Sequence, residues 1–209
     1  MKKHIRYTFV LLVGLVLAGC STTKRIPDGE ILYTGVKKMK FTPAADSLEL
    51  SDRAVSAVKE PLSVKPNNPL YSPYVRTPLP IGLWAWNYLY TEKQKGFKHW
   101  LYNRLAKDPV LISKVRPELR VQVADQIWEN YGYFGVQMGY ELIPNKHKPD
   151  KKAKVSYFGT IPAPHTYDSI AFARSTGAVG HILDSLRSES LVRVGAVYNL
   201  DTLVAERVR

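Results

Sequence analysis

Residues 117–159 read PELRVQVADQIWENYGYFGVQMGYELIPNKHKPDKKAKVSYFG, and this stretch decides the fold. Proline suits the first turn of a helix and glycine the position just after its end. Pro117 and Gly132 therefore predict a helix over 117–131. The apolar spacing predicts one buried stripe on this helix. The stripe consists of Leu119, Val123, Ile127 and Trp128.

Two strands are predicted after this helix. Residues 135–143 alternate between apolar and polar side chains, as a half-buried strand does. Its apolar side consists of Val136, Met138, Tyr140 and Leu142. A basic turn at 145–152 leads to a second strand at 154–159. Helix, strand, turn and strand in this order predict an α+β fold.

The residues before this stretch predict one more strand and further helices. Residues 31–41 are rich in β-formers and predict a first strand. Residues 51–60 predict a helix that Pro61 ends. Residues 62–80 are rich in proline and asparagine, which is typical of an extended loop.

Residues 81–107 combine aromatic side chains with lysine and arginine. Two helical faces are predicted by their spacing. One consists of Trp84, Tyr88 and Leu89, and the other of Phe97, Trp100, Leu101 and Leu105. Such a mixture favours a membrane interface, but apolar residues at helical spacing are more often core. We expect Trp84, Trp86 and Trp100 to belong to the core, with the interface as the alternative.

The C-terminal residues predict a second unit that begins near Tyr167. Residues 167–172 resemble a strand, and residues 179–186 predict a helix. A further helix is predicted over 201–209, with Asp201 as its N-terminal cap. No second pair of strands follows. We therefore expect the sequence to be a piece of a longer protein, with a short protein ending in a helix as the alternative.

The N-terminus has the pattern of a bacterial lipoprotein. A basic start precedes an apolar run over 7–17, and small residues lead to Cys20 in the sequence Leu-Ala-Gly-Cys. We expect residues 1–19 to be a lipoprotein signal peptide, Cys20 to be the lipidated residue, and residues 20–30 to be a lipidated tether. The alternative is a plain signal peptide with a chance cysteine.

Composition limits the partners. The chain has 209 residues, 45% of them hydrophobic, which allows a core, and a formal net charge of +12. An exported basic domain meets anionic lipid head groups or acidic protein surfaces. The signal peptide argues against a nucleic-acid partner.

The sequence predicts no enzyme. It has no His-x-x-x-His pair, glycine-rich phosphate loop or nucleophile elbow. His181, Asp184 and Ser185 could suggest a nucleophile set, but neighbours of this kind are common on helices. Asp46, Glu49 and Asp52 could mimic paired acids or a cation site, but we interpret them as a solvated helix start. We expect no catalytic, metal or cofactor site. A lipoprotein enzyme acting on peptidoglycan or glycans would need paired acids or a metal cluster that the sequence does not show.

Several segments resemble a known family. IWENYGYF at 127–134 with the strands after it, YDSI at 167–170 and VGAVYNLD at 194–201 resemble POTRA domains. POTRA domains precede the barrel of outer-membrane assembly proteins of the BamA/TamA type, in the surface-antigen barrel superfamily. The start at Cys20 and GFKHWL at 96–101 resemble the lipidated TamL variant of that family.

The resemblance implies an organisation into tandem β-α-α-β-β domains. Residues 31–160 would form a first POTRA-like domain with a helical, aromatic insertion near 62–115. Residues 165–209 would form an incomplete second POTRA-like domain. The β-barrel of the family would lie beyond this chain.

The resemblance also implies a function. The chain would be the periplasmic, lipid-anchored N-terminal region of an outer-membrane assembly or translocation factor, with a role in membrane biogenesis. It would bind outer-membrane β-barrel proteins or other envelope clients and pass them to the barrel, with an inner-membrane or periplasmic assembly partner. The anchor would hold it on the periplasmic side of the outer membrane. The alternative is a stand-alone envelope lipoprotein that acts as an interaction or scaffold module.

Strand addition would be the mode of client binding. An extended client segment adds to an exposed sheet edge through backbone hydrogen bonds. The candidate edges are 135–143 and 154–159. Charged residues at an edge discourage unwanted pairing, and Lys152 and Lys154 are interpreted as such edge protection.

Overall fold

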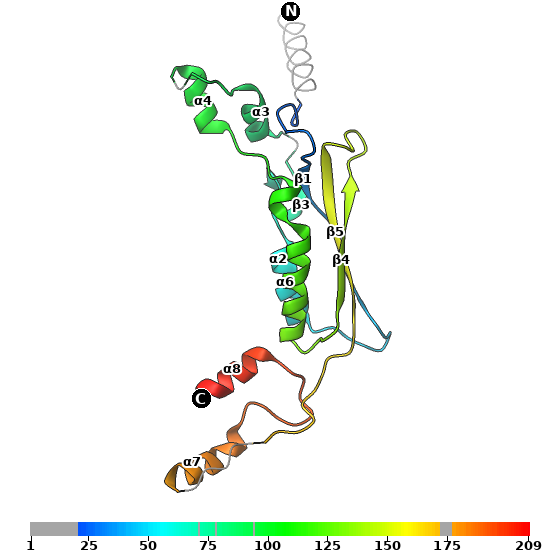
Figure 1. Cartoon of the computed structure of the whole chain (residues 1–209), viewed down its shortest axis with the longest axis vertical. Helices are drawn as coiled ribbons and strands as arrows, with labels where there is room; N and C mark the ends of the chain where they lie inside the picture. Colours follow the sequence, from blue (N-terminus) through cyan, green and yellow to red (C-terminus); the bar gives the residue numbers. More distant parts are fainter. Residues whose placement is uncertain (1–20, 71, 78, 94, 172–176) are drawn as a thin grey trace, which may run out of the picture. The chain divides into compact units, whose positions relative to one another are not determined.

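The computed structural model describes residues 21–70, 72–77, 79–93, 95–171 and 177–209. Helices and strands are mixed along the chain, so the predicted α+β class is confirmed (Figure 1). The predicted signal peptide and Cys20 lie outside the described residues. The elements, in chain order, are β1 (Leu32–Pro43), α2 (Asp52–Leu62), β2 (Pro69–Leu70), β3 (Ser72–Arg76), α3 (Ile81–Tyr88), α4 (Phe97–Leu105), α5 (Ile112–Val115), α6 (Pro117–Asn130), β4 (Gln137–Pro144), β5 (Lys152–Ile161), α7 (Ala178–Leu186), a 3-10 turn η1 (Arg187–Glu189) and α8 (Leu200–Val208).

The main sheet has three strands in the order β1–β5–β4. Backbone N–H groups near the two ends of β1 bond carbonyls near the same two ends of β5, from Leu32 to Lys151 and from Ala44 to Ile161. The two strands therefore run in the same direction. β5 is the central strand and β4 an edge. A separate antiparallel pair is formed by β2 and β3.

The chain divides into two compact units. Unit 1 comprises the residues up to Lys37, Val64–Arg116 and Leu142–Val155. Unit 2 comprises Lys38–Ser63, Pro117–Glu141 and Ser156–Arg209.

The core of unit 2 is built around Trp128. Its ring is fully buried and meets the rings of Phe41 and Tyr133 edge to face, with centroids 5.5 and 5.1 Å apart. α2 packs against α6 and contributes Ala54, Val58 and Leu62. From β5, Tyr157 and Ile161 are fully buried.

The buried face of α6 differs from the predicted stripe. The helix itself and its terminal glycine, Gly132 at φ +87°, are confirmed. Trp128 is buried as predicted, whereas Leu119 and Val123 are exposed. The buried positions are Pro117, Val121, Ala124 and Trp128. α6 carries apolar residues on more than one face, and packing against α2 selects the one that contains the small Ala124.

The helix predicted over 51–60 is confirmed, but Pro61 does not end it. Pro61 lies inside α2, which continues to Leu62. A proline in the last turn removes one helical hydrogen bond and leaves the rest of the helix intact. The Arg120 guanidinium donates a hydrogen bond to the Pro61 carbonyl, which supports the end of the helix.

In unit 1, the segments that the sequence predicts to be a loop and a tether are folded against other parts of the unit. The predicted loop 62–80 contains β2 and β3. In the predicted tether, Thr22, Thr23 and Ile26 are buried. Ile26 forms an apolar cluster with Leu32, Leu83 and Leu111, against which Trp86 packs.

The predicted aromatic helices exist, but the core interpretation is wrong for the second. α3 buries Gly82, Leu83, Ala85 and Asn87, and Tyr88 from the predicted face is exposed. α4 buries none of its residues. Trp100 is 58% exposed and Phe97 74%, because none of the described residues covers these two rings.

Two features of the C-terminal region need correction. Residues 167–171 form no strand, and Thr166 makes only an isolated bridge to Val197. The helical predictions agree with α7 and α8. The cap of α8 is Asn199, whose side-chain oxygen accepts from the backbone N–H groups of Asp201 and Thr202.

Candidate functional site

The main sheet has two edge strands, β1 and β4. Because β5 lies between β1 and β4, both of its sides are paired. The prediction that 154–159 offers a free edge is therefore wrong, and residues 135–143 remain the candidate. Lys152 and Lys154 lie on the paired strand, so the edge-protection interpretation is also wrong. Local patterns predicted both strands, but the pairing with β1 decides which is the edge.

Within unit 2, β4 is fixed on the helix side. The Tyr140 hydroxyl donates a 2.7 Å hydrogen bond to Glu118 Oε1 on α6. This bond to a carboxylate raises the pKa of Tyr140. Gln137 and Glu141 are exposed and Met138 and Tyr140 half-buried, as predicted, but Gly139 and Ile143 are also half-buried, so the strand does not alternate strictly. The contact with α6 positions the edge.

Glycines bring β4 and β5 close together. A Cβ atom at Gly139 would meet the Phe158 ring at 2.8 Å, and one at Gly159 would meet the Met138 sulfur at 2.6 Å. Each glycine is thus covered by a large side chain of the other strand. Phe158 remains 49% exposed and presents an apolar ring beside the edge strand.

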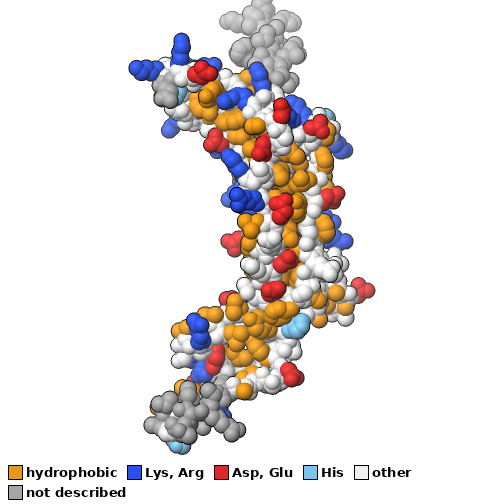
Figure 2. Space-filling view, viewed as in Figure 1, with side chains coloured by type: hydrophobic (Ala, Val, Ile, Leu, Met, Phe, Trp, Pro, Cys, Tyr) orange, Lys and Arg blue, Asp and Glu red, His pale blue; other side chains and the backbone are white. Residues whose placement is uncertain are grey.

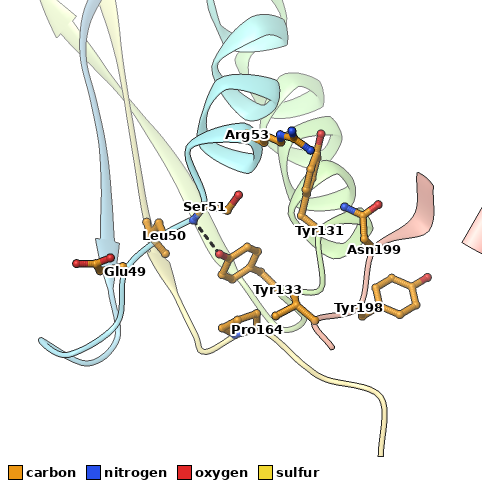
Figure 3. Close-up of a pocket in the computed structure, with 10 residues that line it drawn as sticks. Glu49, Leu50, Ser51, Arg53, Tyr131, Tyr133, Pro164, Tyr198 and Asn199 are labelled. Atoms are coloured by element: carbon orange, nitrogen blue, oxygen red, sulfur yellow. Dashed lines mark hydrogen bonds between the residues drawn. The ribbon is translucent and has the colours of Figure 1, made fainter. Parts of the chain in front are cut away.

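A second candidate is a cavity of about 500 Å³ in unit 2 (Figure 3). It lies where α2 begins, α6 ends and α8 begins. Its lining consists of Glu49, Leu50, Ser51, Arg53, Tyr131, Tyr133, Pro164, Val197, Tyr198 and Asn199.

The wall of this cavity is organised by the chain turn after α6. The Tyr133 hydroxyl accepts a 3.0 Å hydrogen bond from the Ser51 N–H, which holds the start of α2 (Figure 3). The Gly132 carbonyl accepts from His165 N, and the His165 carbonyl accepts from Tyr198 N, both at 2.8 Å. Phe134 packs edge to face on His165 and Tyr198.

The lining of the cavity combines aromatic rings with charged side chains. Three tyrosine rings, one arginine and one glutamate line it, and its lining includes neither histidine nor cysteine. Of the acids weighed from the sequence, only Glu49 lines it, and Asp46 and Asp52 are exposed elsewhere.

The cluster of His181, Asp184 and Ser185 lies on α7. His181 is exposed on α7, and Ser185 Oγ donates to the Ile182 carbonyl of its own helix. The side chain of Asp184 lies outside what the structure describes. Among the described residues, no group of three His, Cys, Asp or Glu side chains could hold a metal ion.

Burial changes the acid–base character of two groups on β5. In unit 1, burial lowers the pKa of Lys152, and Arg76 and Lys148 lower it further. In unit 2, burial raises the pKa of Tyr157 to about 12. Sequence periodicity gave no sign of either shift, because both depend on what other segments cover.

Cys20, the one site residue expected from the sequence, lies outside the described residues. In the part of the chain that is described, no helix has both the length and the apolar character needed to cross a bilayer. Comparison with known proteins finds no matching family model, no matching curated protein and no matching solved structure.

Proposed function

We propose that this chain is the periplasmic, lipid-anchored N-terminal region of an outer-membrane assembly factor. It binds unfolded outer-membrane β-barrel clients at the β4 edge and passes them to a downstream barrel. Cys20 carries the lipid anchor.

The strand order β1–β5–β4 carries this proposal. The elements β1, α2, α6, β4 and β5 follow one another as β-α-α-β-β, which is the order of a POTRA domain. The elements β2 to α5 fall between the two helices in sequence, within the insertion expected near 62–115. Under this proposal, unit 2 holds both helices and the edge-strand segment Gln137–Glu141.

The mechanism is strand addition. An edge strand presents unpaired backbone N–H and C=O groups. An extended client pairs with them largely independently of its side chains, which suits a module with many clients. Phe158 offers an apolar contact next to the backbone ladder. Tyr140, held by Glu118, keeps the edge in place as the client arrives.

Site-specific crosslinking tests the proposal. A photoreactive amino acid replaces Gln137 or Glu141 in the full chain, and an unfolded outer-membrane β-barrel protein is added. The control position is Thr160, which is also exposed and in unit 2 but lies on the paired strand β5. We expect capture at Gln137 and Glu141 to exceed capture at Thr160 by about tenfold. Equal capture at all three positions contradicts the proposal.

Competing peptides identify the type of contact. A peptide from a barrel strand and a scrambled version of it should both reduce the crosslink, because backbone bonds supply the affinity. The same peptide with proline at alternate positions should not compete, since proline lacks the N–H donor. Competition by the proline peptide equal to that of the others would show that side chains, not the edge, hold the client.

A further inference from the structure

α4 presents an apolar surface that the rest of the described chain leaves uncovered. Phe97 and Trp100 are 74% and 58% exposed. Their rings stack with centroids 5.7 Å apart and an angle of 25° between planes. Leu105, the last residue of the same helix, is also exposed. Large exposed aromatic groups of this kind mark sites of interaction.

Basic side chains surround these rings. Residues 90–107 include Lys93, Lys95, Lys98, Arg104 and Lys107, with Glu92 as the single acid. The space-filling view shows Lys and Arg gathered around the end of unit 1 that carries α4, next to apolar side chains (Figure 2). Aromatic rings flanked by lysines fit the head-group layer of an anionic bilayer.

The chain that follows Cys20 is attached to the neighbouring helix α3. The Ser21 N–H donates a 2.8 Å hydrogen bond to the Tyr88 hydroxyl. Asn87 binds the same segment, accepting from Arg25 N and donating to the Thr22 carbonyl. α3 in turn packs against α4.

The Arg25 side chain adds a second attachment. Its guanidinium donates a 2.7 Å hydrogen bond to the Trp86 carbonyl. The same group lies 3.8 Å from the ring centre of Tyr90 and 4.8 Å from that of Trp86, within cation–π range. Ser21, next to the expected lipidation position, is therefore held on α3 through Tyr88. α3 packs against α4, which carries the exposed rings.

We propose that α3 and α4 form a membrane-binding surface that inserts Phe97 and Trp100 into the interface of an anionic bilayer. This surface and an acyl chain on Cys20 would act together, because stable anchoring takes two signals. Lipid fits better than an acidic protein, because exposed aromatic rings beside lysines in the sequence are the combination typical of a membrane interface. The inference rests on the envelope location in the proposed function, but not on client binding at β4.

Vesicle co-sedimentation tests the proposal. All proteins are the full chain with Cys20→Ser, so that no acyl chain is added and residues 1–19 are common to all. Vesicles contain phosphatidylcholine and phosphatidylglycerol at about three to one. We expect the pair Phe97→Ser and Trp100→Ser to lower partitioning by about tenfold.

The matched control removes exposed apolar side chains elsewhere. The pair Leu119→Ser and Val123→Ser lies on α6 in unit 2, where both residues are exposed. It should bind within about twofold of the parent. Equal loss in the two pairs, or no loss in the Phe97 and Trp100 pair, overturns the proposal.

A charge variant separates head-group attraction from apolar contact. The pair Lys95→Gln and Lys98→Gln should weaken binding to the anionic vesicles and leave binding to pure phosphatidylcholine unchanged. An unchanged affinity for anionic vesicles contradicts the electrostatic part.

Fluorescence locates the contact on Trp100. Trp100→Phe keeps an aromatic ring at this position, so binding should stay within about twofold of the parent. In a background that carries Trp84→Phe and Trp86→Phe, the one other tryptophan is Trp128, which is fully buried in unit 2, so the lipid-induced blue shift should disappear when Trp100→Phe is added. A blue shift that persists in this triple variant shows that Trp100 does not insert and overturns the proposal. No client is present, so these outcomes are independent of the β4 crosslinks.

Discussion

Lys152 places an ammonium group in a half-buried, positively charged part of unit 1. Burial lowers its pKa, and so do the nearby Arg76 and Lys148. The charged form is therefore less favourable in the folded chain than in the unfolded chain. Between the folded pKa and the ordinary value of 10.5, the unfolded chain binds more protons, so stability rises with pH. Below the folded pKa, Lys152 is charged in both the folded and the unfolded chain, so the full cost of burying the charge lowers the free energy of unfolding.

The variant Lys152→Met should therefore stabilise the protein at neutral pH. Methionine keeps the volume of the side chain and removes its charge. Solvent screening limits the gain, which we expect to be a rise of about 1 to 3 °C in melting temperature at pH 7. The gain should shrink as pH rises through the folded pKa toward the ordinary lysine value.

Thermal unfolding followed by circular dichroism at neutral and alkaline pH measures this effect. The control Lys146→Met changes an exposed lysine of the same turn and should alter the melting temperature little at either pH. A lower melting temperature for Lys152→Met at pH 7 would mean that its ammonium group makes a net favourable contact.

At the scale of elements, α8 shows how a cap is chosen. Asn199 has extended backbone angles, and its side chain accepts two backbone N–H groups of the first turn. Asp201, the cap expected from the sequence, is already inside the helix, where its charge only favours the helix N-terminus. Asparagine and aspartate are both good caps, so residue preference does not distinguish Asn199 from Asp201. Asn199 is the cap because it lies immediately before Leu200, the first residue of the helix.

Asn199→Ala should destabilise α8 by about 1 kcal/mol, because two N–H groups lose their acceptor. Asp201→Ala should cost less, about 0.3 to 1 kcal/mol, since it removes only a charge near the helix end. Amide hydrogen exchange of residues 201–204 measures both. A larger effect from Asp201→Ala would identify Asp201 as the functional cap.

The existence of the elements could be predicted, but the faces they bury could not. Periodicity and the Pro117 and Gly132 signals placed α6 almost to the residue. The buried face of α6 was missed because it is set by α2, which packs from elsewhere in the sequence. For α4, helical spacing suggested a core that no partner element supplies. A local sequence pattern shows that a segment is helical, but it does not show which other element packs against the helix.

At the scale of the whole molecule, the candidate site depends on non-local pairing. The sequence predicted two strands as possible edges and could not choose, because the choice depends on β1 pairing with β5. The packing of residues 21–26 on α3 was also missed. A polar segment with proline and glycine is typical of a tether, and only the contacts with Tyr88 and Asn87 show otherwise. The β4 strand itself was predicted from its alternation.

In unit 2, Gly132 lies against the backbone of Tyr198 and His165. This glycine has φ +87°, and an added Cβ atom would meet the Tyr198 carbonyl oxygen at 2.8 Å. Gly132→Ala should destabilise the protein by about 2 kcal/mol or more, from backbone strain and displacement of the Tyr198 backbone. Chemical denaturation of the full chain measures the loss.

Gly135→Ala is the matched control. Gly135 also has positive φ, at +73°, but its Cβ position faces open space. Only the backbone strain applies at Gly135, and we expect the free energy of unfolding to fall by about 1 kcal/mol. Equal losses in the two variants would show that the contact with Tyr198 contributes nothing to stability.

The parallel pairing of β1 with β5 also has a consequence for how the chain reaches its fold. Thr34 Oγ1 donates to the Ala153 carbonyl, 119 residues further along, and Ser156 Oγ donates to the Lys38 carbonyl, 118 residues back. At about 5 to 20 residues per second, a ribosome needs roughly 6 to 24 seconds to make the chain between these partners. Until then β1 has no strand beside it. The first strand of the sheet can therefore pair only after the last strand has been made, so the sheet does not form in the order of synthesis.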